Sequence, residues 1–437
     1  MRVLPGPNLN TCYNAFMVLK KISRKTKIAT SLLREQGMLA VSIRTLQYIE
    51  KKQSKTSSSV AKKHAINTRA IYEEILAADP SKPANSSWKG LKGKQQLTFN
   101  WLMPPPGKGS GGHMTIYRFI EHLEKAGHKC RIYLHNPGPH ATVESVRAVM
   151  GDSFPEVDAP MQWLKQDEEM EQADGIFATS WETAYTVYAS KVKAKKFYFV
   201  QDFEPYFYPT GSFSILAENT YKLGLRGITA GGWLEKKLND SYGMVTDSFS
   251  FGSDSETYTF TSQKNRKEVV FYARPYTERR AFELGILTLD LFHRQHPDYT
   301  INFIGWDVSE YDIPFPYKNL GVLDPSELNK VYNRCSVSLV MSLTNMSLLP
   351  LELLSAGCIP VVNEGENNRL VSNNEYIEYV ESDPVSLAKK MSDTVSRKNL
   401  PQHSKLASES VKDCSWDEAG KKFIKIVEKS TRTKSSL

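Results

Sequence analysis

From about residue 96 onward, short apolar segments alternate with amphipathic ones. The apolar runs predict strands over residues 97–103, 130–135, 175–179, 196–201 and 228–230. Between them, apolar residues recur at helical spacing and predict helices over residues 114–126, 183–190 and 214–222. Strands that alternate with helices indicate βαβ units and a parallel sheet.

The alternation stops in a polar stretch, residues 252–267, and then starts again. It predicts strands over residues 269–273, 300–304, 336–341 and 359–363, and helices over residues 279–295, 325–335, 348–356, 384–396 and 416–429. Two successive doubly wound halves predict an α/β fold in which two Rossmann-like domains, residues 96–255 and 256–437, face each other across a cleft. Ligands of such folds bind at the carboxyl ends of the strands. The last helix is a candidate to return to the first domain.

Residues 1–95 have a different pattern. Apolar positions at helical spacing over residues 30–48 alternate with arginines, and Ser, Pro and Lys are frequent over residues 53–62 and 80–89. We therefore expect a basic helical extension followed by a linker. The helix is of a kind that can lie on anionic lipid, and a solvated helix packed on a neighbour is the alternative.

Charge separates the extension from the rest of the chain. The 437 residues have a net charge of +8, but residues 1–65 alone carry +11, which leaves −3 for the remainder. A basic arm on a near-neutral body is not typical of a nucleic-acid-binding domain. The composition, 40% hydrophobic and 24% charged, is that of a globular protein.

The cysteines and the lengths of the apolar runs indicate in which cellular compartment the protein is expected. Five scattered Cys form no CxxC pair, which argues against a zinc site and for reduced thiols. The sequence contains no run of about 18 apolar residues and no signal-peptide core. We expect a cytoplasmic protein, with peripheral attachment to the inner face of the membrane through residues 1–65.

Two strand ends carry residues suited to an anion. Gly111, Gly112 and His113 follow the first predicted strand and open a helix, where small residues let a ligand approach the backbone. A plain tight turn explains these glycines equally well. Arg274 ends a strand in the second half and is followed by Arg279, and both can bind a diphosphate.

Two further segments carry carboxylates. Glu352 lies in an apolar helix, where a ribose diol is a candidate partner, and the residues from Asn345 onward precede that helix and could offer amides to phosphate. Asp202 and Glu204 follow a strand among aromatic residues, a combination that holds sugars. A capping or paired Glu352 and a structural loop at 201–209 are the alternatives. No His/Cys cluster has metal-ligand spacing, so we expect no metal.

Taken together, these residues resemble glycosyltransferases of the GT-B fold, close to family 4, and more narrowly the rhamnosyltransferase group typified by WsaF. The resemblance covers about residues 96–430 and is carried by four segments: PPPGKGSGGH, YFVQDFEPYFYPTGSFSILAENTY, VVFYARPYTERRAFELG and LLPLELLSAGCIPVV.

The resemblance implies transfer of a sugar, L-rhamnose from dTDP-L-rhamnose, to a polysaccharide or lipid-linked glycan, with retention and without metal or other cofactor. It implies that Arg274 binds the diphosphate and that Glu352 is the second Glu of the family's E-x7-E motif. Arg279 stands where the family usually has Lys, and Thr344 replaces the first Glu. Asp202, Glu204 and His113 are then the candidate catalytic or acceptor-positioning residues, and Gly111 and Gly112 would face the donor.

Two other functions remain open at this point. One is a nucleotide-sugar hydrolase or epimerase of the same fold. The other is a carbohydrate-binding or assembly protein without activity. Thr344 in place of the first Glu of the motif is the feature that supports this alternative.

Overall fold

The structure is a computed structural model that describes residues 71–107, 110–136, 142–151, 154–165, 168–261 and 266–434. The chain divides into two units after Ala70, and the description below concerns the unit from Ile71 onward. The predicted basic helix at residues 30–48, the linker at 53–62 and the +11 segment lie outside the described residues.

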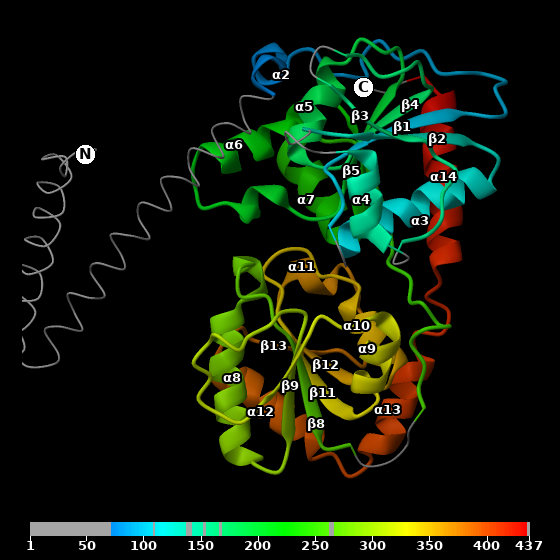
Figure 1. The fold of residues 1–437 in the computed structure, drawn as a ribbon. Coiled ribbons are helices and arrows are strands. Elements are labelled where there is room, and N and C mark those ends of the chain that lie inside the picture. Colours follow the sequence, from blue (N-terminus) through cyan, green and yellow to red (C-terminus); the bar gives the residue numbers. More distant parts are fainter. Residues whose placement is uncertain are drawn as a thin grey trace, which may run out of the picture. The chain divides into compact units, whose positions relative to one another are not determined.

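The first domain is built on a parallel sheet with the strand order β3-β2-β1-β4-β5-β6-β7 (Figure 1). Its elements are α2 (Tyr72–Ala77), β1 (Thr98–Met103), α3 (Gly111–Lys125), β2 (Lys129–Leu134), α4 (Val143–Met150), β3 (Met161–Trp163), β4 (Gly175–Ala178), α5 (Trp181–Ala189), β5 (Lys195–Val200), the 3-10 turns η2 (Glu204–Phe207) and η3 (Thr220–Lys222), α6 (Ser212–Asn219), β6 (Arg226–Ala230), α7 (Gly232–Tyr242) and β7 (Thr246–Phe249).

The second domain has a six-stranded parallel sheet with the order β10-β9-β8-β11-β12-β13. Its elements are β8 (Glu268–Tyr272), the 3-10 turn η4 (Glu278–Arg280), α8 (Phe282–Gln295), β9 (Thr300–Ile304), β10 (Lys318–Gly321), α9 (Pro325–Tyr332), β11 (Cys335–Val340), α10 (Leu349–Ser355), β12 (Ile359–Asn363), α11 (Glu366–Arg369), β13 (Glu378–Val380), α12 (Pro384–Val395) and α13 (Leu400–Glu409). The last helix of the chain is α14 (Trp416–Arg432). The two doubly wound sheets are the predicted α/β architecture.

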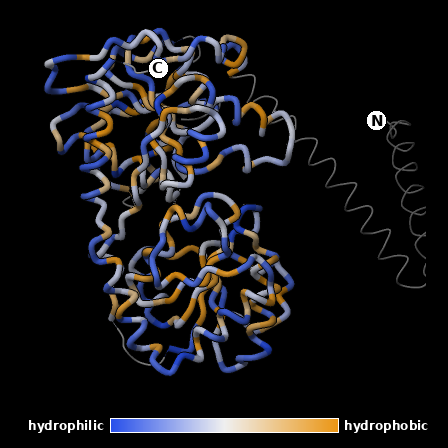
Figure 2. The backbone as a smooth tube through the Cα atoms, turned by 180° about the vertical axis from the view of Figure 1, so that it is seen from behind, coloured by the Kyte–Doolittle hydropathy of each residue, from blue (hydrophilic) through white to orange (hydrophobic). Residues whose placement is uncertain are grey.

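The central strands are apolar because helices cover both faces of each sheet. In β5, Phe197 and Phe199 enter one core cluster, and Tyr198 and Val200 enter the other. Strands buried on both faces read as continuous apolar runs. Figure 2 accordingly shows hydrophobic segments in the interior of each domain.

The last helix of the chain packs on the first domain. Phe423 of α14 is fully buried, and its ring lies 4.4 Å from that of Phe119 in α3. The chain crosses between the domains beside the segment that leads into this helix, because the amide of Ser253 donates to the carbonyl of Cys414 at 2.7 Å.

The predicted boundary at residue 95 differs from the structure. Residues 71–95 pack on the first domain, where Ile71 is buried against α5 and the side chain of Asn85 bonds to the amide and carbonyl of Lys196 at 2.9 and 2.8 Å. The segment at 80–89 is therefore part of this domain, although its Ser and Pro content is typical of a linker.

Helix α8 begins later than predicted. Ala281 has φ +46°, in the left-handed region, so the helix starts at Phe282. Arg279 and Arg280 consequently lie in the preceding 3-10 turn, not in the first turn of the helix.

Candidate functional site

The candidate residues come from loops at the carboxyl ends of central strands. Gln201 and Asp202 follow β5, Arg274 follows β8, and the loop 342–348 follows β11. The turn after β1 leads into α3 at Gly111. In parallel sheets these ends lie at one edge, which is where ligands of doubly wound folds bind.

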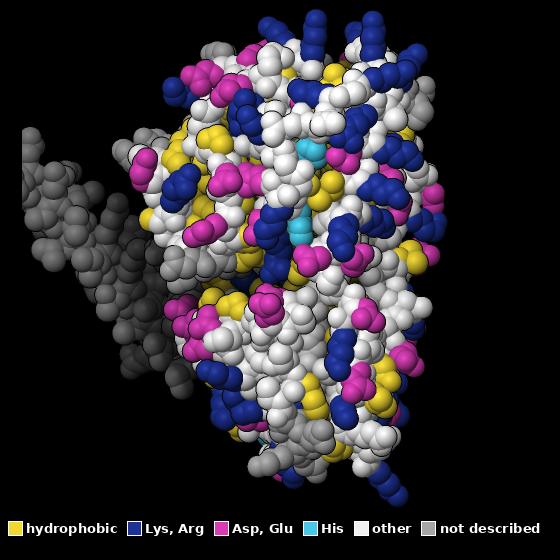
Figure 3. Space-filling model, turned by 90° about the vertical axis from the view of Figure 1, so that its right-hand side faces the viewer, with side chains coloured by type: hydrophobic (Ala, Val, Ile, Leu, Met, Phe, Trp, Pro, Cys, Tyr) yellow, Lys and Arg dark blue, Asp and Glu magenta, His cyan; other side chains and the backbone are white. Residues whose placement is uncertain are grey.

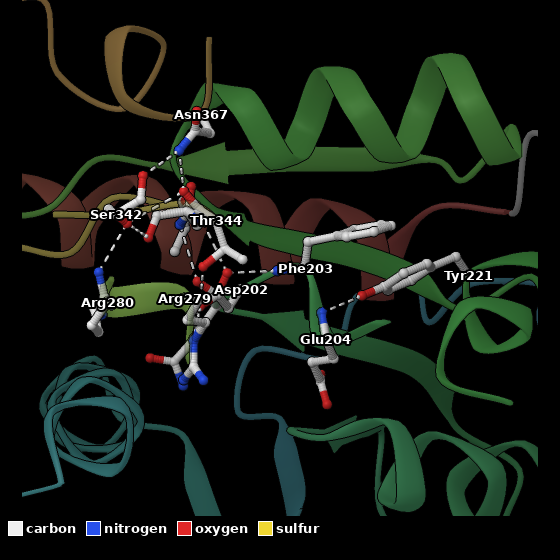
Figure 4. Close-up of polar contacts among 12 residues, drawn as sticks. Asp202, Phe203, Glu204, Tyr221, Arg279, Arg280, Ser342, Thr344 and Asn367 are labelled. Atoms are coloured by element: carbon white, nitrogen blue, oxygen red, sulfur yellow. Dashed lines mark hydrogen bonds and ion pairs between the residues drawn. The ribbon is translucent and has the colours of Figure 1, made fainter. Parts of the chain in front are cut away.

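Asp202 is the centre of the contact between the two domains (Figure 4). One carboxylate oxygen accepts from the amide of Asn345 at 3.0 Å, and the other accepts from the hydroxyl of Thr344 at 3.1 Å and from Arg279 Nε at 3.2 Å. The structure therefore brings together one residue predicted to face the acceptor and three predicted to face the donor.

Asn345 forms a second part of this contact. Its side-chain amide donates to the carbonyls of Gln201 at 3.0 Å and Ala230 at 2.8 Å, and the residue is 2% exposed. Asn367 donates to the carbonyls of Ser342 and Thr344 and so supports the same loop. The amide of Asn345, which the sequence offered to a phosphate, is thus already bonded to Asp202.

Three arginines lie near one another beside this contact: Arg279 bonds to Asp202, and the charges of Arg279 and Arg274 act on Arg280. Arg279 lies over the ring of Phe207 at 4.0 Å, Arg280 donates to Ser342 Oγ at 2.9 Å, and Arg274 donates to the hydroxyl of Tyr272 at 2.6 and 2.8 Å. Burial lowers the pKa of Arg280; the charges of Arg279 and Arg274 lower it further, whereas Asp202 opposes the shift. Three neighbouring guanidinium groups, of which one bonds to Asp202, form a site that favours an additional anion.

The glycine turn lies beside this contact. Gln201 donates to the carbonyl of Gly112 at 3.1 Å, which ties the start of α3 to the end of β5. A Cβ on Gly111 would meet no atom within 4 Å, and one on Gly112 would meet only Gln201 at an ordinary 3.5 Å. Packing within the protein therefore does not require glycine at either position. Close approach of a ligand to the backbone is the remaining reason for a residue without a side chain.

His113 has both ring nitrogens engaged. Nδ1 lies 2.8 Å from Ser110 Oγ, and Nε2 lies 3.0 Å from the carbonyl oxygen of Pro104. Burial lowers the pKa of His113, so the neutral ring is favoured. These bonds fix the turn before α3 and leave its catalytic role a prediction.

Glu204 points away from the Asp202 contact (Figure 4). It is 6% exposed, and its carboxylate accepts from the amide of Trp181 at 2.8 Å and from the hydroxyl of Tyr198. Burial raises its pKa to about 8. This position favours a structural role, in which Glu204 satisfies the first amide of α5.

Glu352 does not join the Asp202 contact. It lies in α10 and bonds to the hydroxyl of Tyr258, with Arg118 and Asp254 nearby. Burial raises its pKa to about 8.

The described residues show neither a metal cluster nor a membrane-spanning helix. Within them, no three His, Cys, Asp or Glu side chains are placed to hold a metal ion. Over the same part of the chain, none of the helices combines the length and the apolar character needed to span a bilayer.

Residues 267–392 match the family described as WsaF, C-terminal domain. The O-antigen biosynthesis protein RfbC of Myxococcus xanthus is 28% identical over 356 residues, which are 79% of this chain. The present chain spans only 28% of the length of that relative.

Solved structures share the architecture at low identity. HepE of Anabaena, crystallised with UDP and glucose, aligns with a TM-score of 0.58 and 11% identity over 76% of this chain and all of its own. A mutant of S. aureus TarM, crystallised with UDP, Fondaparinux and alpha-GlcNAc-glycerol, aligns with a TM-score of 0.60 and 9% identity over 76% of this chain and 99% of its own.

This chain has the GT-B fold. Its second domain is similar to the WsaF C-terminal domain over residues 267–392. The WsaF match covers β8 to α12 and includes Arg274, Arg279, Thr344 and Glu352. The match does not extend to the first domain. The position of Asp202 in the site therefore rests on the structure alone.

Several residues of the GT-B interface escape a reading of the sequence. Tyr272 accepts hydrogen bonds from Arg274, and Gln201 donates to the carbonyl of Gly112. Asn367 donates to the loop after β11. Tyr272 could have been found, because it stands two residues before Arg274 at the end of the same strand. Asn367 carries no such signal, since it comes from α11, 22 residues after Asn345.

Proposed function

We propose that this protein is a glycosyltransferase that transfers a sugar from a nucleotide diphosphate donor to a glycan of a surface polysaccharide. The observation that carries the proposal is the cluster of Arg274, Arg279 and Arg280 beside Asp202, to which Arg279 bonds, at the carboxyl ends of β5 and β8. The name of the M. xanthus relative and the UDP bound to HepE support the same class of reaction and donor.

In this proposal the arginines stabilise the charge that develops on the leaving diphosphate. Arg274 and Arg279 take the two phosphates, and Glu352 takes the ribose. Gly111 and Gly112 leave room for the donor sugar, and Thr344 and Asn345 border its site. Asp202 positions the acceptor hydroxyl, with His113 at the edge of the acceptor side.

The finer proposal is that the donor is dTDP-L-rhamnose, that the transfer proceeds with retention and without a metal ion, and that residues 1–65 keep the enzyme at an anionic membrane near a lipid-linked acceptor. Support comes from the WsaF match, and from the +11 charge of that segment. Deletion of residues 1–65 should reduce binding to anionic liposomes and spare transfer to a soluble acceptor.

A screen of dTDP-, UDP- and GDP-sugars by thermal shift tests the donor, because a ligand bound only by the folded state raises the unfolding midpoint. Arg274→Ala should abolish both the shift and the transfer while the protein stays folded. The exposed Arg294, which pairs with Asp290, provides the control Arg294→Ala. Near-normal turnover in Arg274→Ala would overturn the donor-site assignment.

Two further measurements distinguish the alternatives. A hydrolase or epimerase consumes the donor efficiently without acceptor. A binding protein without activity shows no nucleotide affinity by calorimetry, and the specific observation that favours it is Thr344 in place of the first motif Glu.

A further inference from the structure

A cavity lies at the amino-terminal edge of the first sheet, opposite the edge that carries Asp202. It has a volume of about 320 Å³ and lies between the amino ends of β5 and β6, the turn before β7 and the C-terminal end of α14. Asp202 follows the other end of β5, so about six residues of strand, roughly 20 Å at about 3.3 Å per residue, separate this cavity from the Asp202 contact.

Lys195 opens into this cavity and has no partner. The residue is 5% exposed, and no described residue forms a hydrogen bond or ion pair with its side-chain amine. Its neighbour Lys196, which faces the opposite side of the sheet, shows the normal arrangement: its amine donates to the carbonyls of Tyr188 at 2.7 Å and Ser190 at 2.8 Å. The side chain of Lys195 is largely buried, and its amine, which no described residue engages, is available to an anionic ligand in the cavity.

The wall of the cavity is basic. Besides Lys195 it includes Lys222, Arg226, Lys429 and Lys434, and no Asp or Glu is among the lining residues. Figure 3 shows Lys and Arg side chains projecting from the upper end of the molecule, where the C-terminus lies in Figure 1.

Part of this charge has a local explanation. Arg226 pairs with Asp247, and Lys429 lies in the last turn of α14, where a cation is favoured by the helix dipole. Neither explanation applies to Lys195, because it begins a strand and the nearby charge of Arg226 repels it. The amine of Lys195 therefore carries a positive charge in the cavity that no described residue balances.

We propose that this cavity binds a phosphate group, held by Lys195 at its base and by Lys222 and Lys429 at its mouth, at a site separate from the donor site. The volume exceeds that of a phosphate ion alone, so the phosphate can carry a small polar substituent. Two sources have this chemistry, a soluble phosphorylated compound and the headgroup of an anionic lipid.

Trace labelling of lysines with acetic anhydride, read by mass spectrometry of each peptide, reports on this site alone. Burial lowers the pKa of Lys195 to about 8, so a measurable share of the amine is neutral and reactive near pH 7. A phosphate beside it would raise that pKa, and a rise of about one unit reduces the reactive fraction about tenfold. We expect inorganic phosphate or glycerol phosphate to reduce labelling of Lys195 by about that factor and to leave the exposed Lys193 unchanged.

A parallel sample with vesicles of phosphatidylglycerol, against phosphatidylcholine, distinguishes the sources. Protection by the soluble phosphates indicates a soluble ligand, and protection only by phosphatidylglycerol indicates a lipid headgroup. The double variant Lys222→Gln/Lys429→Gln should lose the protection, whereas Lys193→Gln should keep it. Equal labelling of Lys195 with and without every probe, or undiminished protection in the double variant, would overturn the proposal. Because Arg274→Ala leaves this cavity intact, the same labelling in that variant is independent of the proposed donor site.

Discussion

The hydroxyl of Thr344 donates a hydrogen bond to the carboxylate of Asp202 at 3.1 Å, and this bond joins a loop of the second domain to a loop of the first. Thr344 is 1% exposed. The family that the sequence resembles has Glu at this position. Here a Glu would place a second carboxylate against Asp202, and two carboxylates that share one site resist being ionised together. Thr344 therefore suits the position beside Asp202, because its uncharged hydroxyl donates a hydrogen bond to the carboxylate.

The first prediction concerns this pair. Thr344→Glu should lower the free energy of unfolding by about 1–3 kcal/mol, since it adds a buried like charge and removes a satisfied hydrogen bond. Asp202→Asn in the same chain should recover part of the loss. Thermal and urea unfolding of the two single variants and the double variant form a mutant cycle that measures the coupling.

Thr344→Ser is the matched control for this cycle, because it keeps the hydroxyl donor. It should unfold within about 0.5 kcal/mol of the wild type, apart from the lost methyl packing. Additive effects of Thr344→Glu and Asp202→Asn would show that the two side chains are not coupled.

The second prediction concerns Arg279, which combines a bond to Asp202 with stacking on Phe207. Arg279→Lys keeps the charge but loses the planar stacking and the directed bond. If this residue binds a diphosphate mainly through its charge, nucleotide affinity should fall only a few-fold in Arg279→Lys and by more than about tenfold in Arg279→Ala. Calorimetry with a nucleoside diphosphate measures both, and wild-type affinity in Arg279→Ala would contradict the assignment.

The sequence predicts the central strands well because burial on both faces leaves a clear apolar run. The expected strands at 300–304 and 359–363 coincide with β9 and β12. The edge strands β3, β7, β10 and β13 were missed, since apart from Phe249 their residues are only partly buried or exposed and their pattern resembles that of a loop.

The candidate site could be predicted only in part. Asp202 and Glu204 stand two residues apart after the same strand, and each is an acid among aromatic residues. Only the tertiary structure shows that Asp202 meets the second domain and that Glu204 turns inward to Trp181. The direction of a side chain in an irregular loop depends on distant partners, which residue type and spacing do not encode.

The third prediction is a pH dependence that arises from Glu204. Its pKa rises from an ordinary 4.5 to about 8 in the folded protein. Between these values the folded state holds a proton that the unfolded state has released, so stability falls as the pH rises through this window, by at most about 1.4 kcal/mol per pH unit for one group. Glu352 adds a change of the same sign.

Glu204→Gln should therefore reduce the slope of the unfolding midpoint between pH 5 and pH 8 without removing it. Unfolding by urea across this range measures the slope, and Glu256→Gln, at an exposed position, is the control. A slope in Glu204→Gln equal to that of the wild type would show that Glu204 is ionised in the fold.

The fourth prediction concerns the last helix, α14. It follows the second domain in the sequence, but its residue Phe423 packs in the core of the first domain. Phe423 is fully buried among Phe119, Trp101 and Phe177. Phe423→Ala should lower the free energy of unfolding by about 3–5 kcal/mol through the cavity it leaves, whereas Lys425→Ala, at an exposed position of the same helix, should have little effect. Hydrogen exchange should show the loss of protection in α3 and β1, not in β8 or β9. A loss confined to the second domain would mean that α14 does not stabilise the first.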